Sequence, residues 1–489
     1  MSDLSKQAGI LSATEFFRFF IKTIIGIALA RLITPSELGS YRQLFLIYST
    51  FSTFLLLGIP QSILYFLPRC KNQQEQNKII SQTINVVSFL ALGFAISIYL
   101  LRGLIADKFS NPNLDSLLLL YAIYPLFMFI TQLYSSIMLG LKAPLRAAKF
   151  TVFAIFCDLF LILGVAYWTR NLYYIVWAVV ASAFLQWLYA RIKLWHYHRS
   201  QAPWDFSGFR VQLAYSIPLG LSSIIGMLSV QLDKFMISGF FSPEQFAVFS
   251  VGAMELPLIG ILSNSVNSIL LPHLSSGNPA EMGTLYSGAV RKNALIVFPI
   301  TALFYLFAEP LMVFLYGAVY ADAAIYFKIY LFALPLRIAT YGIIFQAFGK
   351  TKIIMLNSLF VLIANFALNY LLILKMGMKG AALATVIVTW LSVIVYLVQM
   401  KSILKLKLKD YFPLEKIAKT LFVTMISSII IIPVIRLIHI PLLSMFLGGV
   451  IFLMVYLLTG RWFGVILNYD LQTIVSLGKD ILRSIDKRK

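Results

Sequence analysis

The sequence predicts an all-α polytopic membrane protein of about 14 transmembrane helices: two six-helix bundles related by a parallel repeat, followed by two extra C-terminal helices. Three observations predict this fold class. Of the 489 residues, 60% are hydrophobic and 12% are charged, and the mean hydropathy is +0.86. Apolar stretches of about 20 residues, each long enough to cross a bilayer as a helix, recur along the whole chain. Finally, short segments in the first half are echoed in the second half.

Hydropathy and helix-breaking residues locate the spans in order. No hydrophilic stretch is long enough for a soluble domain. The N-terminus lacks the order of regions that marks a signal peptide, so the first apolar segment is predicted to be a span itself. The predicted spans are 10–33, 43–67, 79–105, 116–140, 147–168, 171–194, 211–240, 245–272, 284–308, 323–348, 353–375, 379–400, 416–438 and 441–467.

The echoed segments define an internal repeat with an offset of about 206 to 210 positions. Because six spans is an even number, the two copies would insert the same way up, which predicts a parallel repeat about an axis along the membrane normal. We expect an N-lobe (1–200), a C-lobe (201–410), the two extra spans (411–467) and a cytoplasmic amphipathic tail (468–489). The matches are Pro35–Tyr41 with Pro243–Phe249, Ser62–Leu64 with Ser268–Leu270, Pro125 with Pro335, and Asp158 with Asn365.

The net charge of +21 predicts the orientation in the membrane. Lys and Arg collect on cytoplasmic loops, and a cytoplasmic N-terminus puts about 27 of the 40 basic residues on inner segments and about 8 on outer loops. We therefore expect both termini in the cytoplasm. This distribution accounts for the basic charge without nucleic acid as a partner.

Several charged residues fall inside predicted spans. Glu15, Arg18 and Lys22 share one face of the first span, since they lie at i, i+3 and i+7. A cation at mid-bilayer costs about 2.5–3.5 kcal/mol on insertion scales, so these bases should face a protein-lined or watery interior. They form either a fixed ion pair with Glu15 or the wall of a cationic cavity. The other intramembrane charges are Lys234, Arg337, Asp158, Asp233 and Glu255.

The sequence indicates no cofactor, metal site or disulfide framework. Cys70 falls in a short loop and Cys157 inside a span, so the two cysteines are not expected to pair. His196 and His198 are close-spaced but have no carboxylate or thiol partner nearby in the sequence. A phosphate-binding P-loop pattern is also lacking, and we do not expect an enzyme.

At this point the chain resembles a known family. The segment ARLITPSELGSY, which contains Arg31, Pro35, Gly39 and Tyr41, ends the first span, and Gln231–Lys234 followed by SPEQFAVFSVG ends the seventh. With the six-plus-six repeat and two extra spans, these features resemble the Wzx-type oligosaccharide flippases. Their superfamily of multidrug, oligosaccharidyl-lipid and polysaccharide exporters (MOP) also holds the MATE-type multidrug exporters and the lipid II flippases. One departure is Ala247, which stands where the first copy has Gly39.

The resemblance implies transport of an oligosaccharide on a polyprenyl pyrophosphate from the cytoplasmic to the outer leaflet of the inner membrane, for surface polysaccharide synthesis. It also implies coupling to an H⁺ or Na⁺ gradient, with membrane lipids and polysaccharide export proteins as further partners. The two equal bundles of the repeat themselves predict a central cavity and alternating access. For an anionic headgroup we expect the bases to bind substrate and the acids to serve as cavity or coupling groups. The expected substrate-binding residues are Arg18, Lys22, Lys234 and Arg337, and the expected acids are Glu15, Asp158, Asp233 and Glu255.

Two other functions compete with this interpretation. A multidrug exporter of the same fold would carry organic cations, which favour a cavity with excess acid, whereas buried bases and acids are about equal here. An integral-membrane polymerase or glycosyltransferase would carry a large outer loop or a carboxylate-rich loop, but every predicted outer loop is short. Neighbouring glycosyltransferase and polymerase genes would favour the flippase.

Overall fold

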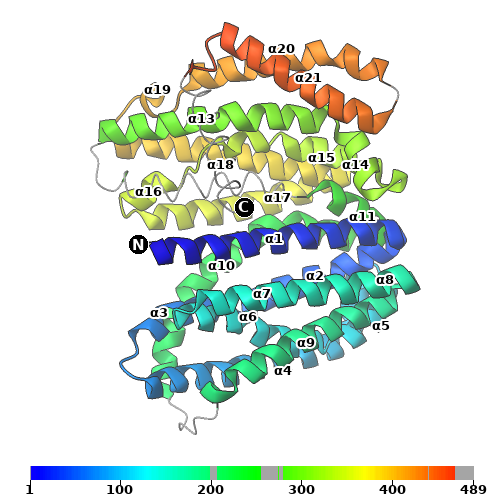
Figure 1. Cartoon of the computed structure of the whole chain (residues 1–489), viewed down its shortest axis with the longest axis vertical. Helices are drawn as coiled ribbons and strands as arrows, with labels where there is room; N and C mark the ends of the chain where they lie inside the picture. The colour runs from blue at the N-terminus through cyan, green and yellow to red at the C-terminus, as the bar shows by residue number, and fades with distance from the viewer. Residues whose placement is uncertain (1, 199–205, 255–273, 275–278, 439, 469–489) are drawn as a thin grey trace, which may run out of the picture. The chain divides into compact units, whose positions relative to one another are not determined.

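The structure is a computed structural model of the whole chain and describes residues 2–198, 206–254, 274, 279–438 and 440–468. Within these residues all regular structure is helical. The chain divides into two compact units (Figure 1). The first unit comprises Met1–Ser250 and Leu315–Val319, and the second comprises Val251–Phe314 and Tyr320–Lys489.

The first unit is a helical bundle in which α4, α6, α7 and α9 lie side by side and α1 packs along α7 (Figure 1). Its helices, in order, are α1 (Ser2–Leu32), α2 (Pro35–Leu56), α3 (Ile59–Phe66), η1 (Leu67–Arg69), α4 (Gln73–Lys108), α5 (Asn113–Tyr121), α6 (Tyr124–Gly140), α7 (Pro144–Cys157), η2 (Asp158–Leu163), α8 (Gly164–Thr169), α9 (Leu172–His198), α10 (Phe206–Phe240) and most of α11 (Pro243–Gly252).

The second unit packs α13 against α20, α19 and η4, and pairs α17 with α18 as a helical hairpin. Its helices are α13 (Pro279–Leu306), α14 (Ala308–Tyr316), α15 (Ala323–Leu331), η4 (Leu334–Ile338), α16 (Ile343–Ala347), α17 (Thr351–Met376), α18 (Met378–Leu404), α19 (Leu408–Tyr411), α20 (Leu414–Leu437) and α21 (Pro441–Trp462). The end of α14 and most of η3 (Ala318–Tyr320) belong to the first unit, which includes Leu315–Val319.

In the described part of the chain, nine helices are long and apolar enough to cross a membrane, and three bent helix pairs raise the number of candidate spans to 12. The first predicted span, α1, is not among them because its charges exceed that criterion. Most of the eighth, 245–272, lies outside the described residues. The polytopic helical fold is confirmed, whereas the number of 14 stays a prediction.

The three bent pairs correspond to predicted spans 2, 4 and 10, and each has a local cause. The bends are 46° between α2 and α3, 51° between α5 and α6, and 42° between α15 and the segment that follows it. At the first bend Gly58 has φ +76, a left-handed conformation that glycine adopts without strain, and Pro60 follows in the first turn of α3. Pro125 and Pro335 occupy the same place at the other two bends.

The repeat is visible in how α2 and α11 begin. Oγ1 of Thr34 accepts from the N–H of Glu37 while Oε2 of Glu37 accepts from the N–H of Thr34. The N–H groups of Gln245 and Ser242 make the same reciprocal bonds at the start of α11. Both copies therefore start this helix with a capping box, which satisfies free N–H groups of the first turn.

The two equivalent helix starts also touch each other within the first unit. A Cβ on Gly39 would overlap the carbonyl of Pro243, so the backbones are in contact there. Arg42 Nη1 donates to Oγ of Ser250 at 2.7 Å, and these two residues are equivalent in the repeat, 208 positions apart. Because α10 packs on α2 and α3, the compact units do not coincide with the expected lobes 1–200 and 201–410, which remain a prediction from the repeat.

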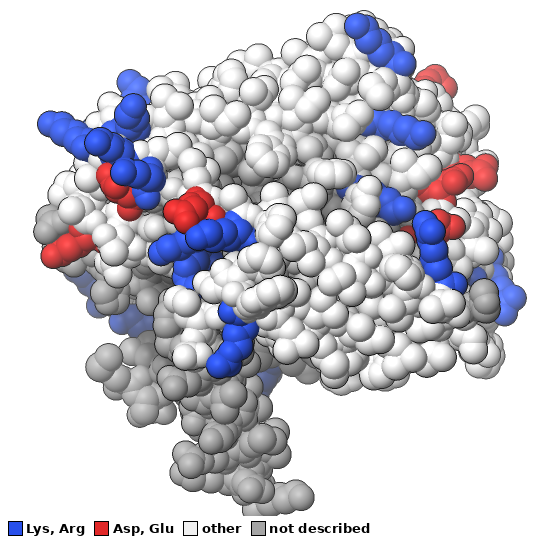
Figure 2. All heavy atoms as spheres, turned by 90° about the horizontal axis from the view of Figure 1, so that it is seen from above, with Lys and Arg blue, Asp and Glu red and all other residues white. Residues whose placement is uncertain are grey.

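On the face shown in Figure 2, Lys, Arg, Asp and Glu gather towards two opposite sides and leave a broad area of uncharged side chains between them. Many large apolar side chains are exposed, including Phe89, Leu100, Ile363 and Leu458. An exposed uncharged area of this kind suits contact with lipid.

Candidate functional site

A pocket of about 210 Å³ lies inside the first unit, where α1, α2, α6, η2 and α9 converge. It combines charged groups with aromatic rings in a span-forming part of the chain. The lining residues are Arg18, Lys22, Ile25, Gly26, Tyr41, Phe45, Tyr124, Met128, Asp158, Ile162, Val179, Ala183 and Gln186.

The cations of the pocket come from α1. Arg18 and Lys22 are one turn apart and therefore project from the same side of the helix. Glu15, one turn earlier, pairs with Arg18 at 3.6 Å, and its Oε1 also accepts from the hydroxyl of Thr151 on α7 at 3.3 Å. The Arg18 and Glu15 side chains stay 37% and 51% exposed. Glu15 thus neutralises part of the charge of Arg18.

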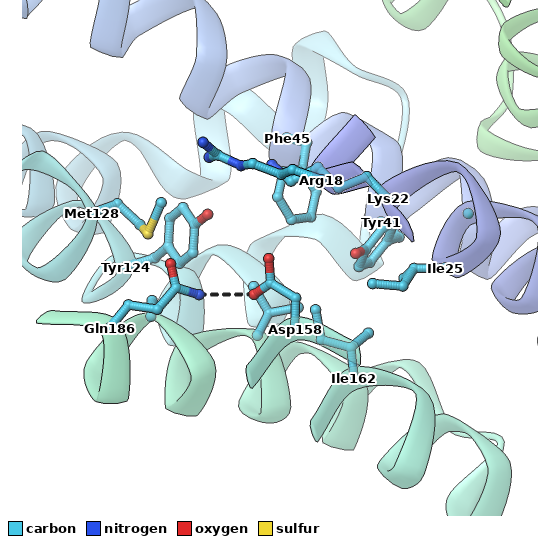
Figure 3. A pocket seen from close by; sticks show the side chains of 13 residues that line it. Arg18, Lys22, Ile25, Tyr41, Phe45, Tyr124, Met128, Asp158, Ile162 and Gln186 are labelled. Carbon is cyan, nitrogen blue, oxygen red and sulfur yellow. Dashed lines mark hydrogen bonds between the residues drawn. The ribbon is translucent and has the colours of Figure 1, made fainter. Parts of the chain in front are cut away.

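Asp158 lies on the opposite side of the pocket from Arg18 and Lys22 (Figure 3). Its Oδ1 accepts hydrogen bonds from Oγ of Ser182 (2.7 Å) and from Nε2 of Gln186 (2.9 Å), both on α9. Its other oxygen points into the pocket in Figure 3. Asp158 also begins η2, a π-helical turn between α7 and α8. Such turns occur often at functional sites because they re-aim side chains within a helix.

Aromatic rings from α2 and α6 form the remaining wall. The ring centroids of Tyr41 and Phe45 are 4.9 Å apart, and those of Phe45 and Tyr124 are 6.1 Å apart. Tyr124 is buried and stacks on Tyr121 at 4.5 Å. The wall is rigid because these rings pack against each other, and it offers two phenol groups to a ligand.

The pocket can accommodate an anion between Arg18 and Lys22 on one side and the tyrosines on the other. Two bases, Arg18 and Lys22, line the pocket with the carboxylate of Asp158, and Glu15 pairs with Arg18 from outside the lining. Hydrogen bonds from charged donors to an anion are the stronger ones in proteins, and a site of low dielectric strengthens them further.

The other predicted site residues lie elsewhere. Lys234 is on α10 and is not among the lining residues; its N–H donates to Oδ1 of Asp233 at 2.7 Å, and its Nζ donates to the carbonyl of Val230 at 3.4 Å. Asp233 is buried. Arg337 is exposed on η4 of the second unit, and Glu255 lies outside the described residues.

The predicted motif residues other than Tyr41 have structural roles at the end of α1 and in the first turns of α2. Arg31 Nε donates to the carbonyl of Leu315 at 2.9 Å and ties the end of α1 to that segment. Pro35 is the first residue of α2, and Gly39 allows the contact with Pro243. Tyr41 lines the pocket, so the motif links the helix start to the site.

Sequence reasoning missed three polar side chains of the site. Ser182 and Gln186 are spaced i, i+4 within an apolar span, a signal that could have identified them as partners of a carboxylate. Tyr124 directly precedes Pro125, the proline that the repeat matches with Pro335, but the sequence did not identify it as a residue of the site. In the sequence, Asp158 has no basic residue on its own helix face, whereas the fold brings Arg18 and Lys22 to the same pocket.

Residues 28–325 match the family described as polysaccharide biosynthesis protein. The capsular polysaccharide biosynthesis protein CapF of Staphylococcus aureus is 25% identical over 405 residues, which cover 80% of this chain and 96% of that protein.

Solved structures of membrane transporters share the fold. The lipid II flippase MurJ in an inward closed conformation matches with a TM-score of 0.76 at 17% identity, and the match covers 93% of this chain and 98% of the MurJ chain. A multidrug resistance transporter of the MATE family in the MOP superfamily has a TM-score of 0.66 at 14% identity, with 79% and 94% covered. A MOP superfamily transporter from Pyrococcus furiosus has a TM-score of 0.57 at 17% identity, with 82% and 97% covered. The chain therefore has the MOP transporter fold, as predicted.

Proposed function

The chain belongs to the polysaccharide biosynthesis protein family and is a multi-pass membrane protein, and on this premise we propose that it is a flippase for a polyprenyl-pyrophosphate-linked oligosaccharide. It moves this substrate from the cytoplasmic to the outer leaflet of the cell membrane by alternating access. The fold shared with a lipid II flippase and the relationship to a capsular polysaccharide protein support this proposal. The reaction is transport without covalent chemistry.

The observation that carries the proposal is the pocket in which Arg18 and Lys22 face Tyr41, Tyr124 and Asp158. A pyrophosphate carries at least two negative charges and many acceptor oxygens, which match a guanidinium, an ammonium and phenol donors. Each charge-assisted contact contributes about 1.5–3 kcal/mol, enough to hold a headgroup that must later leave. A volume of about 210 Å³ suits the headgroup, with the glycan outside the pocket.

Lys234 and Arg337 belong to the same proposal as later contacts for the headgroup. Neither lines the pocket, and each comes from the second copy of the repeat. A headgroup that leaves Arg18 and Lys22 needs further cations along its route, because an unpaired anion at membrane depth is costly.

Asp158 is the proposed coupling acid, with H⁺ or Na⁺ as the coupled ion. Ser182 and Gln186 hold one carboxylate oxygen and leave the other directed at the pocket. There the carboxylate competes with the substrate anion for Arg18 and Lys22. Protonating Asp158, or binding a cation to it, makes those bases available to the headgroup. Asp233, Glu15 and Glu255 remain secondary candidates for this role.

A multidrug exporter is the second candidate, and the aromatic wall beside Asp158 favours it. An organic cation could stack on Tyr41, Phe45 and Tyr124 with its charge near Asp158. The two functions differ in the effect of the bases, since Arg18 and Lys22 would repel such a cation. Removing them should improve export of organic cations and abolish export of an anionic lipid.

The test is reconstitution of the full chain in proteoliposomes with a polyprenyl-pyrophosphate oligosaccharide in the inner leaflet, read by a lectin or glycosidase that reaches only the outer leaflet. We expect Arg18→Ala and Lys22→Ala each to slow translocation at least tenfold, as the loss of one charged contact predicts. Lys149→Ala is the matched control, because Lys149 is an exposed base of α7 that does not line the pocket. Unchanged translocation by both pocket variants would reject the headgroup assignment.

A further inference from the structure

The interface between α10 and the first copy of the repeat contains two buried clusters of uncharged polar side chains. In the first, the Gln43 cluster, Gln43 Nε2 donates to Oγ of Ser238 at 2.9 Å. Asn111 Nδ2 donates to Oε1 of Gln43 at 2.6 Å and to Oγ of Ser40 at 2.8 Å. All four side chains are at most 2% exposed. The cluster joins α2, the α4–α5 connection and the last turns of α10.

The second, the Gln212 cluster, lies near the other end of α10. Gln212 Nε2 donates to Oγ of Ser62 on α3 at 3.0 Å and to Oγ1 of Thr83 on α4 at 3.2 Å. Ser62 and Thr83 are fully buried and Gln212 is 6% exposed. Along α2 and α3, Gln43 and Ser62 are 19 residues apart, which is at most about 28 Å of helix, and the 46° bend between the two helices shortens this separation. The two clusters therefore lie towards opposite ends of the second predicted span, 43–67.

Thr50 on α2 lies seven residues after Gln43, and Gln231 on α10 lies seven residues before Ser238, so both are on the helix faces that carry the Gln43 cluster. Among the described residues, Oγ1 of Thr50 on α2 and Oε1 of Gln231 on α10 are buried and accept or donate no hydrogen bond. The helices that carry them, α2 and α10, pack directly on each other. Buried polar atoms without a partner are rare and costly, and water that reaches them removes the cost.

Buried polar side chains make an interface easier to open to water than an interface of apolar side chains alone. Separating an apolar contact in water forfeits the whole free energy of burial, in proportion to its area. Separating a hydrogen-bonded contact replaces protein partners with water, and the net loss is small. In a chain that is 60% hydrophobic, fully satisfied polar clusters at both ends of one interface favour reversible opening to water.

We propose that the Gln43 cluster and the Gln212 cluster are two latches that open in turn, each admitting water to the α2–α10 interface from one side of the membrane. Breaking one latch shifts the protein towards the state open at that end and away from the state open at the other. The inference rests on alternating access in the proposed function but is independent of the substrate that is carried.

The test measures water access to Thr50 in the full chain in intact cells. Thr50→Cys is introduced after Cys70→Ser and Cys157→Ser have removed the native thiols. The rate of labelling by an impermeant maleimide added outside is then compared between variants. Gln43→Ala and Gln212→Ala should each change the labelling rate by about two- to tenfold, and in opposite directions. The size of the change follows from the net free energy that one hydrogen bond contributes.

The control is Gln132→Ala, which removes an amide hydrogen bond to the hydroxyl of Tyr48 (2.7 Å) that involves no residue of α10. It should leave the labelling rate unchanged. Ser238→Ala and Ser62→Ala repeat the comparison with smaller changes, so that it does not depend on glutamine variants that fail to reach the membrane. Shifts in the same direction for both latches, or no shift, would refute the proposal. Because no glycan takes part in labelling, a failed glycan assay bears on the proposed function alone.

Discussion

At the scale of single residues, the environment of Asp158 explains how one carboxylate can respond to substrate. Ser182 and Gln186 are neutral donors, so they fix the position of the carboxyl group without supplying a charge. Arg18 and Lys22 line the same pocket and are its basic residues. In the proposed mechanism, a headgroup anion and the carboxylate of Asp158 compete for these two bases.

Asp158→Asn should uncouple transport from the ion gradient. Asparagine keeps an oxygen for Ser182 and Gln186 but has no charge and no titration, so the bases stay available to the headgroup throughout the cycle. We expect bound lipid-linked oligosaccharide to be retained, while translocation in proteoliposomes loses its response to an imposed H⁺ or Na⁺ gradient. Asp107→Asn, at an exposed position of α4, is the control and should respond normally. A normal gradient response from Asp158→Asn would exclude this residue as the coupling acid.

At the scale of elements, the two copies of the repeat share the hydrogen bonds that cap α2 and α11 but differ in a residue of the first turns of these helices. The reciprocal bonds of Thr34 with Glu37 and of Ser242 with Gln245 start α2 and α11 in the same way. The residue four positions after each proline differs, Gly39 against Ala247. At Gly39 the backbone of the first copy lies against the carbonyl of Pro243, where the methyl group of an alanine would overlap it.

Gly39→Ala should therefore destabilise the contact between α2 and α11. The added methyl group would overlap the Pro243 carbonyl, so the two backbones must separate, a kind of overpacking that costs about 1–3 kcal/mol. We expect a lower Tm for the detergent-solubilised protein. Gly93→Ala in α4 is the control: its Cβ would meet nothing within 4 Å, and alanine is the better helix former by about 0.5–1 kcal/mol. Equal Tm values for the two variants would contradict the proposed close approach.

At the scale of the whole molecule, the excess of Lys and Arg sets the expected orientation. With a cytoplasmic N-terminus, the inner segments hold about 27 of the 40 basic residues, and this distribution predicts that both termini are cytoplasmic. The structure refines the choice of reporter on the outer side. Asn111 is buried and bonded to Gln43, so it is unsuited to labelling, whereas Asn113 on α5 is exposed.

Single cysteines introduced after removal of Cys70 and Cys157 test this orientation. In intact cells, Asn113→Cys should react with an impermeant maleimide, while Ser2→Cys and Ser484→Cys should react only after the membrane is permeabilised. The permeabilised sample is the control for reactivity of each thiol. Labelling of both termini in intact cells, with Asn113→Cys protected, would reverse the assigned topology.

The sequence by itself determined the class of fold, most of the spans, the repeat and the family. These depend on local properties: runs of apolar residues, helix-breaking prolines and glycines, and a helix-start motif that appears twice. It also identified Arg18, Lys22 and Asp158 as charges too costly to face lipid. In each case the property depends on the free energy of placing one residue, or one stretch of about 20 residues, in the membrane.

Only the tertiary structure decided which of these charges meet. Arg18 and Lys22 share a pocket with Asp158 because α1 packs on α7 and η2, while Lys234 lies apart from that pocket on α10. It also decided that Gln186 and Ser182 hold the carboxylate, and that Gln43, Asn111 and Ser238 form one cluster. The physical reason is that hydrogen bonds and ion pairs act over a few ångströms between residues far apart in the chain, and helix packing alone brings them within that range.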